Sequence, residues 1–414
     1  MSSYDTLLNK DALLVAQELG QTSSATNITI ARGLEWLEER LAPGPIMVEP
    51  DLNYVYKTAW AFFLAGKSAT TARLLDWVLD RAVQESGDLF LPEVESSQGI
   101  YRQSWLLRTA SSLGHPLGAI ERVRDRMRQY QNTTGGVVDS IGDDPHHPHP
   151  AGNPSASATA AFGEFAIAAG LIEDARRAGD WLLRLVEQNE RHFPNGEFYF
   201  ALAPNGVLAS EAALDMRPSK VVGTKGREEP TWILAIATAF LVDLYAALRH
   251  RGTPHDTSSQ YLEGALRLFA FDCQMPLDVY FSWNRCKMAW SAGRLLQVLT
   301  AFKLGDLDTY DSLYRCARRT YRHTFLGTRL ADGSWGHELH DDEETAIDQQ
   351  TLEGISAVPT EEAWQRHRGH KVPFSSSIEI TSENVVMTLH LRAGIQALEQ
   401  ELSIGARSGP PIEA

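Results

Sequence analysis

Apolar residues recur along most of the chain with the spacing of one face of an α-helix. Extended pieces are few and short, at 88–91, 136–139, 198–200 and 333–336. The pattern therefore predicts an all-α protein whose extended pieces lie in the connections. The predicted helices span 5–19, 26–41, 53–66, 69–86, 99–114, 116–130, 155–170, 172–187, 228–250, 257–272, 281–303, 307–325 and 378–402.

The connections between these helices alternate between short and long. Tight turns at Gly66, Gly114 and Gly170 each place a glycine where it can end a helix and let the chain reverse. Long connections follow the partner helices, at roughly 87–98, 131–154, 188–227, 273–280 and 326–377. This alternation is typical of helical hairpins joined by loops that gather on one face.

We therefore predict an (α/α)6 toroid, a ring of six hairpins closed by the C-terminal helix packing against the N-terminal hairpin. The inner helices would be those following the long loops, which are rich in small residues, and 5–19 would be an additional helix. We expect residues 1–402 to form a single domain and 403–414 a flexible tail. The long loops and the N-termini of the inner helices would then share one mouth of the ring.

Four predicted inner helices begin with a charged residue, any residue, a small residue and tryptophan. Residues three apart share a helix face, so each helix presents a charge and an indole together. Tryptophan alone is often core packing, but a charge beside it needs water, a ligand or a countercharge. We therefore expect all eight side chains to border one central cavity. They are Lys57 and Trp60, Arg102 and Trp105, Glu229 and Trp232, and Lys287 and Trp290.

Two segments carry a family resemblance. Gln131 and Gly135-Gly136-Val137 precede a helix rich in Ala, Ser and Thr, and Asp332-Gly333-Ser334-Trp335-Gly336 follows a later helix. These segments resemble the repeat of the terpenoid cyclase and protein prenyltransferase toroids. Six-hairpin glycosidases and sugar epimerases have a similar ring and similar loops. The DxDD and DDxxD motifs of the cyclases and the zinc ligands of the prenyltransferases have no counterpart here, so the resemblance implies the fold and not those catalytic residues.

The candidate site residues follow from their place at the expected mouth. Charged side chains there could hydrogen-bond a carbonyl and stabilise developing charge. The candidate catalytic residues are Lys57, Arg102, Glu229, Lys287 and Glu383. The candidate substrate-binding residues are Tyr54, Tyr56, Trp60, Tyr101, Trp105, Trp232, Trp283, Asn284, Trp290, Trp335 and His337.

Three functions remain open at this point. The first is a cofactor-independent cyclase, isomerase or lyase that folds a polyene- or terpenoid-like molecule in an aromatic cavity. The second is a carbohydrate-active ring, a glycoside hydrolase or sugar epimerase, which would need paired carboxylates. The third is a binding toroid without chemistry. Lys or Arg beside tryptophan in three of the four repeats favours the first.

The composition limits the kinds of molecule that this protein is expected to bind and the compartment in which it is expected to occur. A formal charge of -15 disfavours nucleic acid and anionic membranes, so we expect a small-molecule substrate. The N-terminus lacks the features of a signal peptide, and no span of about 18 apolar residues is expected. Three dispersed cysteines favour a reducing compartment, and we expect a cytoplasmic protein. The histidines at 146, 147 and 149 could bind a metal, but nothing in that loop aims them at one point, so we expect no metal and no cofactor.

Overall fold

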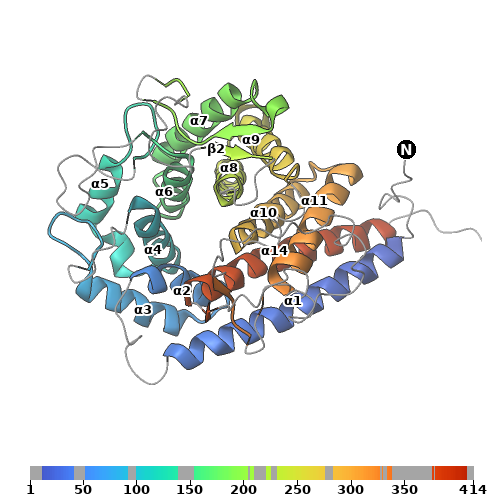
Figure 1. The fold of residues 1–414 in the computed structure, drawn as a ribbon, viewed down its shortest axis with the longest axis horizontal. Coiled ribbons are helices and arrows are strands. Elements are labelled where there is room, and N and C mark those ends of the chain that lie inside the picture. Colours follow the sequence, from blue (N-terminus) through green and yellow to red (C-terminus); the bar gives the residue numbers. More distant parts are fainter. Residues whose placement is uncertain are drawn as a thin grey trace, which may run out of the picture.

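The computed structural model describes residues 12–41, 52–91, 99–138, 153–203, 206–208, 221–224, 231–275, 283–326, 329, 333–337, 375–376 and 378–407. These residues form a ring of helices in two layers (Figure 1). The inner helices are α2 (Leu52–Leu64), α4 (Ile100–Leu113), α6 (Ala156–Ala168), α8 (Trp232–His250), α10 (Lys287–Phe302) and α14 (Ile378–Arg407). The outer helices are α1 (Ala12–Leu41), α3 (Ser68–Arg81), α5 (Glu121–Gln129), α7 (Ile172–Asn189), α9 (His255–Asp272) and α11 (Leu307–Thr320).

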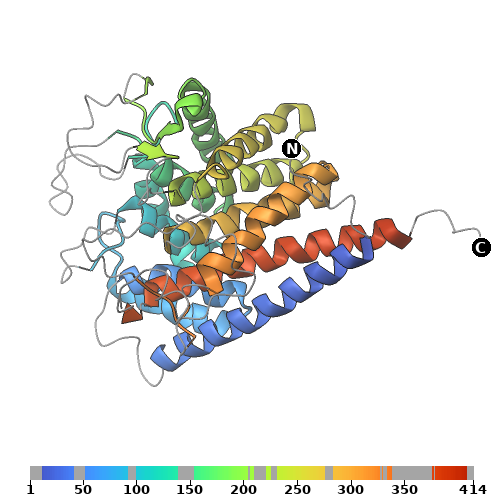
Figure 2. The ribbon, with the colours of Figure 1, turned by 45° about the vertical axis from the view of Figure 1, so that its right-hand side comes forward.

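The inner layer closes on itself, because each inner helix packs against the next and α14 packs against α2. The N-terminal helix α1 and the C-terminal helix α14 run side by side in opposite directions, as both views show (Figure 2). The predicted closure of the (α/α)6 toroid by the two ends of the chain is therefore confirmed.

Small residues allow the inner helices to approach closely, as the sequence suggested. A Cβ added at Gly293 of α10 would lie 2.3 Å from the carbonyl oxygen of His390 in α14. A Cβ at Gly163 of α6 would lie 2.2 Å from the ring of Phe240 in α8. Any larger side chain at these two crossings would push neighbouring inner helices apart.

The short elements lie in the connections. Strand β1 (Glu197–Tyr199) pairs antiparallel with β2 (Val221–Gly223), and β3 (Gly336–His337) pairs antiparallel with β4 (Ser375–Ser376). The remaining elements are the 3₁₀ helices η2 (Pro116–Ala119), η3 (Phe193–Asn195) and η7 (Trp283–Cys286), and the π-helical turn η8 (Tyr321–Leu326).

The glycine motifs that carried the family resemblance form a recurring turn. Isolated bridges join Val83 to Leu89, Gln131 to Val137, Leu202 to Leu208 and Arg329 to Trp335. Each turn contains a glycine with positive φ, as at Gly135, where φ is 93°. A Cβ there would also lie 2.2 Å from the carbonyl oxygen of Arg177 in α7. The motif is therefore a structural device that seats one hairpin on an outer helix of the next.

Several helix boundaries differ from those predicted. The separate helices expected at 5–19 and 26–41 are one continuous helix from Ala12, so α1 is the outer partner of α14 and no additional helix precedes it among the described residues. Gly20 is accommodated inside that helix. The helix expected at 116–130 is broken at Ile120, whose extended backbone separates η2 from α5. Helix α14 continues to Arg407, past the predicted start of the tail.

Helix α8 is long and apolar enough to span a membrane, contrary to the expectation that the chain has no such stretch. However, 83% of its apolar window is buried inside the ring. Burial on all sides explains why the helix is apolar all round.

Candidate active site

A cluster of charged side chains lies where the N-terminal ends of three inner helices meet. It is called the mouth cluster and comprises Tyr56 and Lys57 of α2, Lys287 of α10, and Glu379 and Glu383 of α14. The ammonium groups of Lys57 and Lys287 form ion pairs with the two carboxylate oxygens of Glu383, one each. Glu379 lies 3.7 Å from Lys57 and accepts a hydrogen bond from the Tyr56 hydroxyl at 2.6 Å.

The mouth cluster is buried, and its charges compensate one another. Burial tends to raise the pKa of Glu383, but Lys287 and Lys57 outweigh it and lower that pKa to about 2. Burial tends to lower the pKa of Lys57, but Glu383, Tyr101 and Glu379 together outweigh burial and raise that pKa. Glu383 is therefore an ionised carboxylate held between two ammonium groups.

Aromatic side chains from α4 and α8 border the mouth cluster. Tyr101 and Trp232 are in edge-to-face contact, with ring centroids 5.8 Å apart, and the ammonium of Lys287 lies 5.1 Å from the Trp232 ring. Burial raises the pKa of Tyr101, and a contact with the Trp105 indole N–H lowers it in part, although no well-aligned hydrogen bond to the hydroxyl forms among the described residues. Cys286 donates its thiol toward Glu383 at 3.5 Å.

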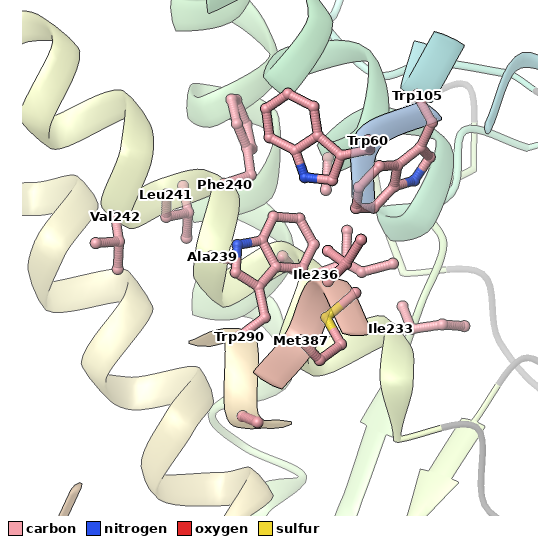
Figure 3. Packing of buried hydrophobic residues seen from close by; sticks show 14 of the residues in the cluster. Trp60, Trp105, Ile233, Ile236, Ala239, Phe240, Leu241, Val242, Trp290 and Met387 are labelled. Atoms are coloured by element: carbon pink, nitrogen blue, oxygen red, sulfur yellow. The ribbon is translucent and has the colours of Figure 1, made fainter. Parts of the chain in front are cut away.

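A second cluster lies further along the inner helices. It is called the axial cluster and comprises Trp60, Trp105, Arg108, Glu164, Asp243, Trp290, Arg294 and His390. The three indoles gather beside Ile236 and Met387 (Figure 3). The Arg108 guanidinium lies 4.4 Å from the Trp60 ring centre, 5.4 Å from that of Trp105 and 5.3 Å from that of Trp290. One buried cation is thus shared by three indoles that come from three helices.

Two carboxyl groups face this cation. Arg108 lies 3.0 Å from one oxygen of Glu164 and 3.5 Å from Asp243, and Asp243 also pairs with Arg294 at 2.5 Å. Burial raises the pKa of Glu164, Arg108 lowers it, and Asp243 raises it again, with a net value of about 8. The neighbouring carboxyl groups of Glu164 and Asp243 therefore retain a proton between them at neutral pH inside the ring.

The axial cluster contains polar atoms whose hydrogen-bonding capacity is unmet among the described residues. They are the indole nitrogens of Trp60, Trp105 and Trp290, Nη1 of Arg108, Oε1 of Glu164 and Nε2 of His390. Burial, together with Arg108 and Arg294, lowers the pKa of His390, so its imidazole is neutral. Because buried polar groups normally have partners, this concentration along one axis is typical of a site that receives a polar ligand.

The structure brings part of the predicted site together. Lys57, Lys287 and Glu383 are in direct contact, and the countercharge that the repeat required is Glu383. Trp60, Trp105 and Trp290 share Arg108, whereas Trp232 is the first residue of α8 and lies at the mouth cluster. The four tryptophans therefore do not lie at one depth in the ring. Trp232 is the first residue of its helix, whereas the other three follow the start of their helices by several residues.

Other predicted residues lie elsewhere or outside the description. Arg102 is partly buried at the start of α4. Trp335 is fully buried, donates its indole N–H to the Phe325 carbonyl at 2.9 Å and packs beside Gly33 of α1, which is a packing role. Glu229 and the histidines at 146, 147 and 149 lie outside the described residues, as do the side chains of Tyr54, Trp283, Asn284 and His337.

The sequence interpretation missed the charged residues of the axial cluster. Arg108 follows Trp105 by three residues and so continues the same charge-and-indole stripe. Glu164 is the only charged residue of α6, and Asp243 is the only one in the first four turns of α8. A single charge inside an apolar helix was the signal that could have found them.

Within the described part of the chain, no group of three or more His, Cys, Asp or Glu side chains is arranged to hold a metal ion. The expectations of no metal and no cofactor remain predictions.

Comparison with known proteins supports the fold. No family model and no curated protein sequence matches this chain. A possible member of the GH105 family from Salmonella enterica serovar Paratyphi A aligns with a TM-score of 0.51 and 8% identity, covering 89% of this chain and 94% of that one. A D-mannose isomerase aligns with a TM-score of 0.48 and 11% identity, covering 85% of each chain. The type II terpene cyclase MstE from Scytonema aligns with a TM-score of 0.46 and 14% identity, covering 91% and 99%. With the closed inner layer, the first of these likenesses shows that the chain has the α/α toroid fold.

Proposed function

We propose that this ring is an enzyme that rearranges a small molecule by proton transfer, as an isomerase or a cyclase. The observation that carries the proposal is Glu164, a buried carboxyl group beside Asp243 with a pKa of about 8, whose Oε1 accepts no hydrogen bond from a described residue. A carboxylic acid that keeps its proton at neutral pH is suited to general acid catalysis.

In this proposal Arg108 orients Glu164 through one carboxyl oxygen, and the other oxygen faces the substrate. Glu164 donates its proton to the substrate, and Arg108 stabilises the carboxylate that results. The neutral imidazole of His390, which stacks on Trp290, is available to form a hydrogen bond with the substrate through Nε2. The product has the same composition as the substrate. Glu164 therefore regains its proton either from the reacting molecule, when that molecule loses a proton to form the product, or from solvent.

We assign the mouth cluster to substrate binding. Glu383 keeps Lys57 and Lys287 charged and in place. A substrate that lies beside Trp232 would be close to the positive charges of these two lysines. Tyr101 offers a hydroxyl that makes no well-aligned hydrogen bond among the described residues. The catalytic roles predicted for Lys57, Lys287 and Glu383 stay part of this proposal, together with a cytoplasmic location.

Two substrate classes fit, each for a reason of its own. The buried rings of Trp60, Trp105 and Trp290 favour a polyene- or terpenoid-like molecule, because large apolar aromatic surfaces pack well against a hydrocarbon chain. The unpaired indole N–H groups and the neighbouring carboxyls of Glu164 and Asp243 favour a sugar, which would bring many hydroxyls and need acid–base chemistry.

Glu164→Gln tests the proton donation by Glu164, which the proposal requires for either substrate class. Glutamine keeps the size and the contact with Arg108 but has no proton to transfer. Sugar and terpenoid libraries would be incubated with the protein in deuterated water, and products of unchanged composition that carry solvent deuterium would be sought by mass spectrometry. We expect turnover in the wild type and a loss of about 10²–10⁴-fold in the variant.

The matched control is Glu187→Gln on the outer helix α7, where the side chain is exposed, and it should keep full activity. Full activity in Glu164→Gln would contradict the assignment of the acid. A product heavier by one water would show hydrolysis and contradict an isomerase or cyclase.

A further inference from the structure

Two cysteines that are 43 residues apart in the sequence lie together in the outer layer of the ring. Cys273 caps the C-terminal end of α9, and Cys316 belongs to α11. Their sulfur atoms are 2.7 Å apart, and neither cysteine is in a disulfide. A disulfide requires about 2.05 Å, so closing the remaining gap needs a shift of roughly 0.7 Å.

Both cysteines are held by their surroundings. The residue before Cys273, Asp272, forms a buried ion pair with Arg285, which also donates to the Asp272 carbonyl at 2.7 Å. Cys316 is 8% exposed on the inward side of α11, and its carbonyl accepts a hydrogen bond from Thr320 at 2.9 Å. The two thiols are therefore placed by the end of α9 and by α11, two helices that each pack on an inner helix, and not by loops.

We propose that Cys273 and Cys316 form an intramolecular disulfide when the protein meets a low-molecular-weight disulfide. The thiolate of Cys273, the more accessible of the two, attacks the reagent, forms a mixed disulfide and expels one reagent thiolate. Cys316 then attacks the Cys273 sulfur and expels the second. Two protein thiols are oxidised by two electrons in total, one reagent disulfide is reduced to two thiols, and the two protons end on those thiols.

The cross-link would join two neighbouring hairpins. Helix α9 packs on the inner helix α8, and α11 packs on the inner helix α10. A disulfide between the outer helices closes the chain from 273 to 316 and restricts the unfolded state, which stabilises the ring. The contact with Cys316 and burial raise the pKa of the Cys273 thiol, so we expect the exchange to be slow and to speed up at alkaline pH.

The test is to incubate the folded, full-length protein with glutathione disulfide at mildly alkaline pH and to map its peptides without reduction. We expect two of the three thiols to disappear, a linked pair of peptides containing Cys273 and Cys316, and a mass lower by two hydrogens. The melting temperature should rise by about 5 °C and fall back when a reductant is added.

Cys273→Ser and Cys316→Ser should each abolish the linked peptides, whereas Cys286→Ser should keep them. Because Cys273 is only partly buried, its variant remains informative if Cys316→Ser does not fold. A stable mixed disulfide on Cys273, three unmodified thiols after long incubation, or a cross-link that forms only in denaturant would each overturn the proposal.

Discussion

Glu383 of the mouth cluster and Glu164 of the axial cluster are both buried glutamates on inner helices of the same ring, and both contact cations. Two lysines hold Glu383, and its pKa is about 2. Glu164 has one arginine, which it shares with Asp243, and its pKa is about 8. One residue type is therefore a permanent anion in one cluster and an acid in the other.

The difference teaches that the number of cations in direct contact with a buried carboxyl group, two at Glu383 and one at Glu164, decides its protonation more than burial does. Burial raises the pKa of both glutamates. Two ammonium groups overcome that effect at Glu383, whereas Glu164 contacts the guanidinium of Arg108 alone, and the neighbouring Asp243 carboxyl group raises its pKa again. In the function that we propose, the mouth cluster binds and orients the substrate and the axial cluster transfers the proton.

The largest effect on stability is expected for Glu383→Gln. The change leaves Lys57 and Lys287 buried, with only Glu379 at 3.7 Å from Lys57 as a remaining carboxylate of the mouth cluster. We expect a loss of about 3–5 kcal/mol, measured as the free energy of unfolding in urea.

The control for that change is Glu38→Gln, which removes an ion pair with Lys67 at the surface. Its cost should stay below about 1 kcal/mol. If the two variants lose the same stability, the mouth cluster does not depend on its carboxylate and the contrast with the axial cluster fails.

The two glutamates should also give opposite limbs in the pH dependence of stability. The folded-state pKa of Glu383 lies below its ordinary 4.5, so its contribution is present above about 4.5 and is lost as the pH falls toward 2. That of Glu164 lies above 4.5, so the folded chain holds a proton that the unfolded chain releases. Stability from Glu164 is therefore present below about 4.5 and is lost as the pH rises through 8.

Each limb amounts to a few kcal/mol at most, on the order of 1.4 kcal/mol per pKa unit. Melting temperatures measured across this pH range should fall between pH 4.5 and pH 8 in the wild type but not in Glu164→Gln. A fall of the same size in that variant would assign the effect to another group.

The smallest effect on stability is expected for Tyr101→Phe. The Tyr101 hydroxyl makes no well-aligned hydrogen bond among the described residues, so removing it should change the free energy of unfolding by less than about 1 kcal/mol. If the hydroxyl binds substrate, KM should rise several-fold while the melting temperature stays constant.

Tyr130→Phe provides the comparison. Its buried hydroxyl donates to Asp88 at 2.8 Å, so the variant should lose about 1–3 kcal/mol with no change in KM. An equal loss of stability in both variants would mean that the Tyr101 hydroxyl is a structural group and not part of the binding site.

The fold was largely predictable because its signals are local. The helical spacing of apolar residues and the turn glycines Gly66, Gly114 and Gly170, which all have positive φ, depend on neighbours in the sequence. The separate helix expected at 5–19 was wrong because propensity around Gly20 suggested a break that packing of α1 along α14 overrides.

The candidate site was predictable only in part. The repeat of charge and tryptophan identified Lys57, Lys287 and four indoles, three of which meet around Arg108 inside the ring. Arg108, Glu164 and Asp243 come from α4, α6 and α8 and meet across the axis. Their association depends on ring closure, which no local pattern encodes.

The sequence by itself determined the hairpins, their order around the ring and the stripe of charges and indoles on the inner helices, because these follow from residues within a few turns of one another. Only the tertiary structure decided which charges meet. Lys57 and Glu383 are 326 residues apart and Arg108 and Asp243 are 135 apart, so their contacts exist only once the ring has closed. The pKa of each glutamate follows from those contacts, because electrostatic effects in a buried site depend on distances of a few ångströms.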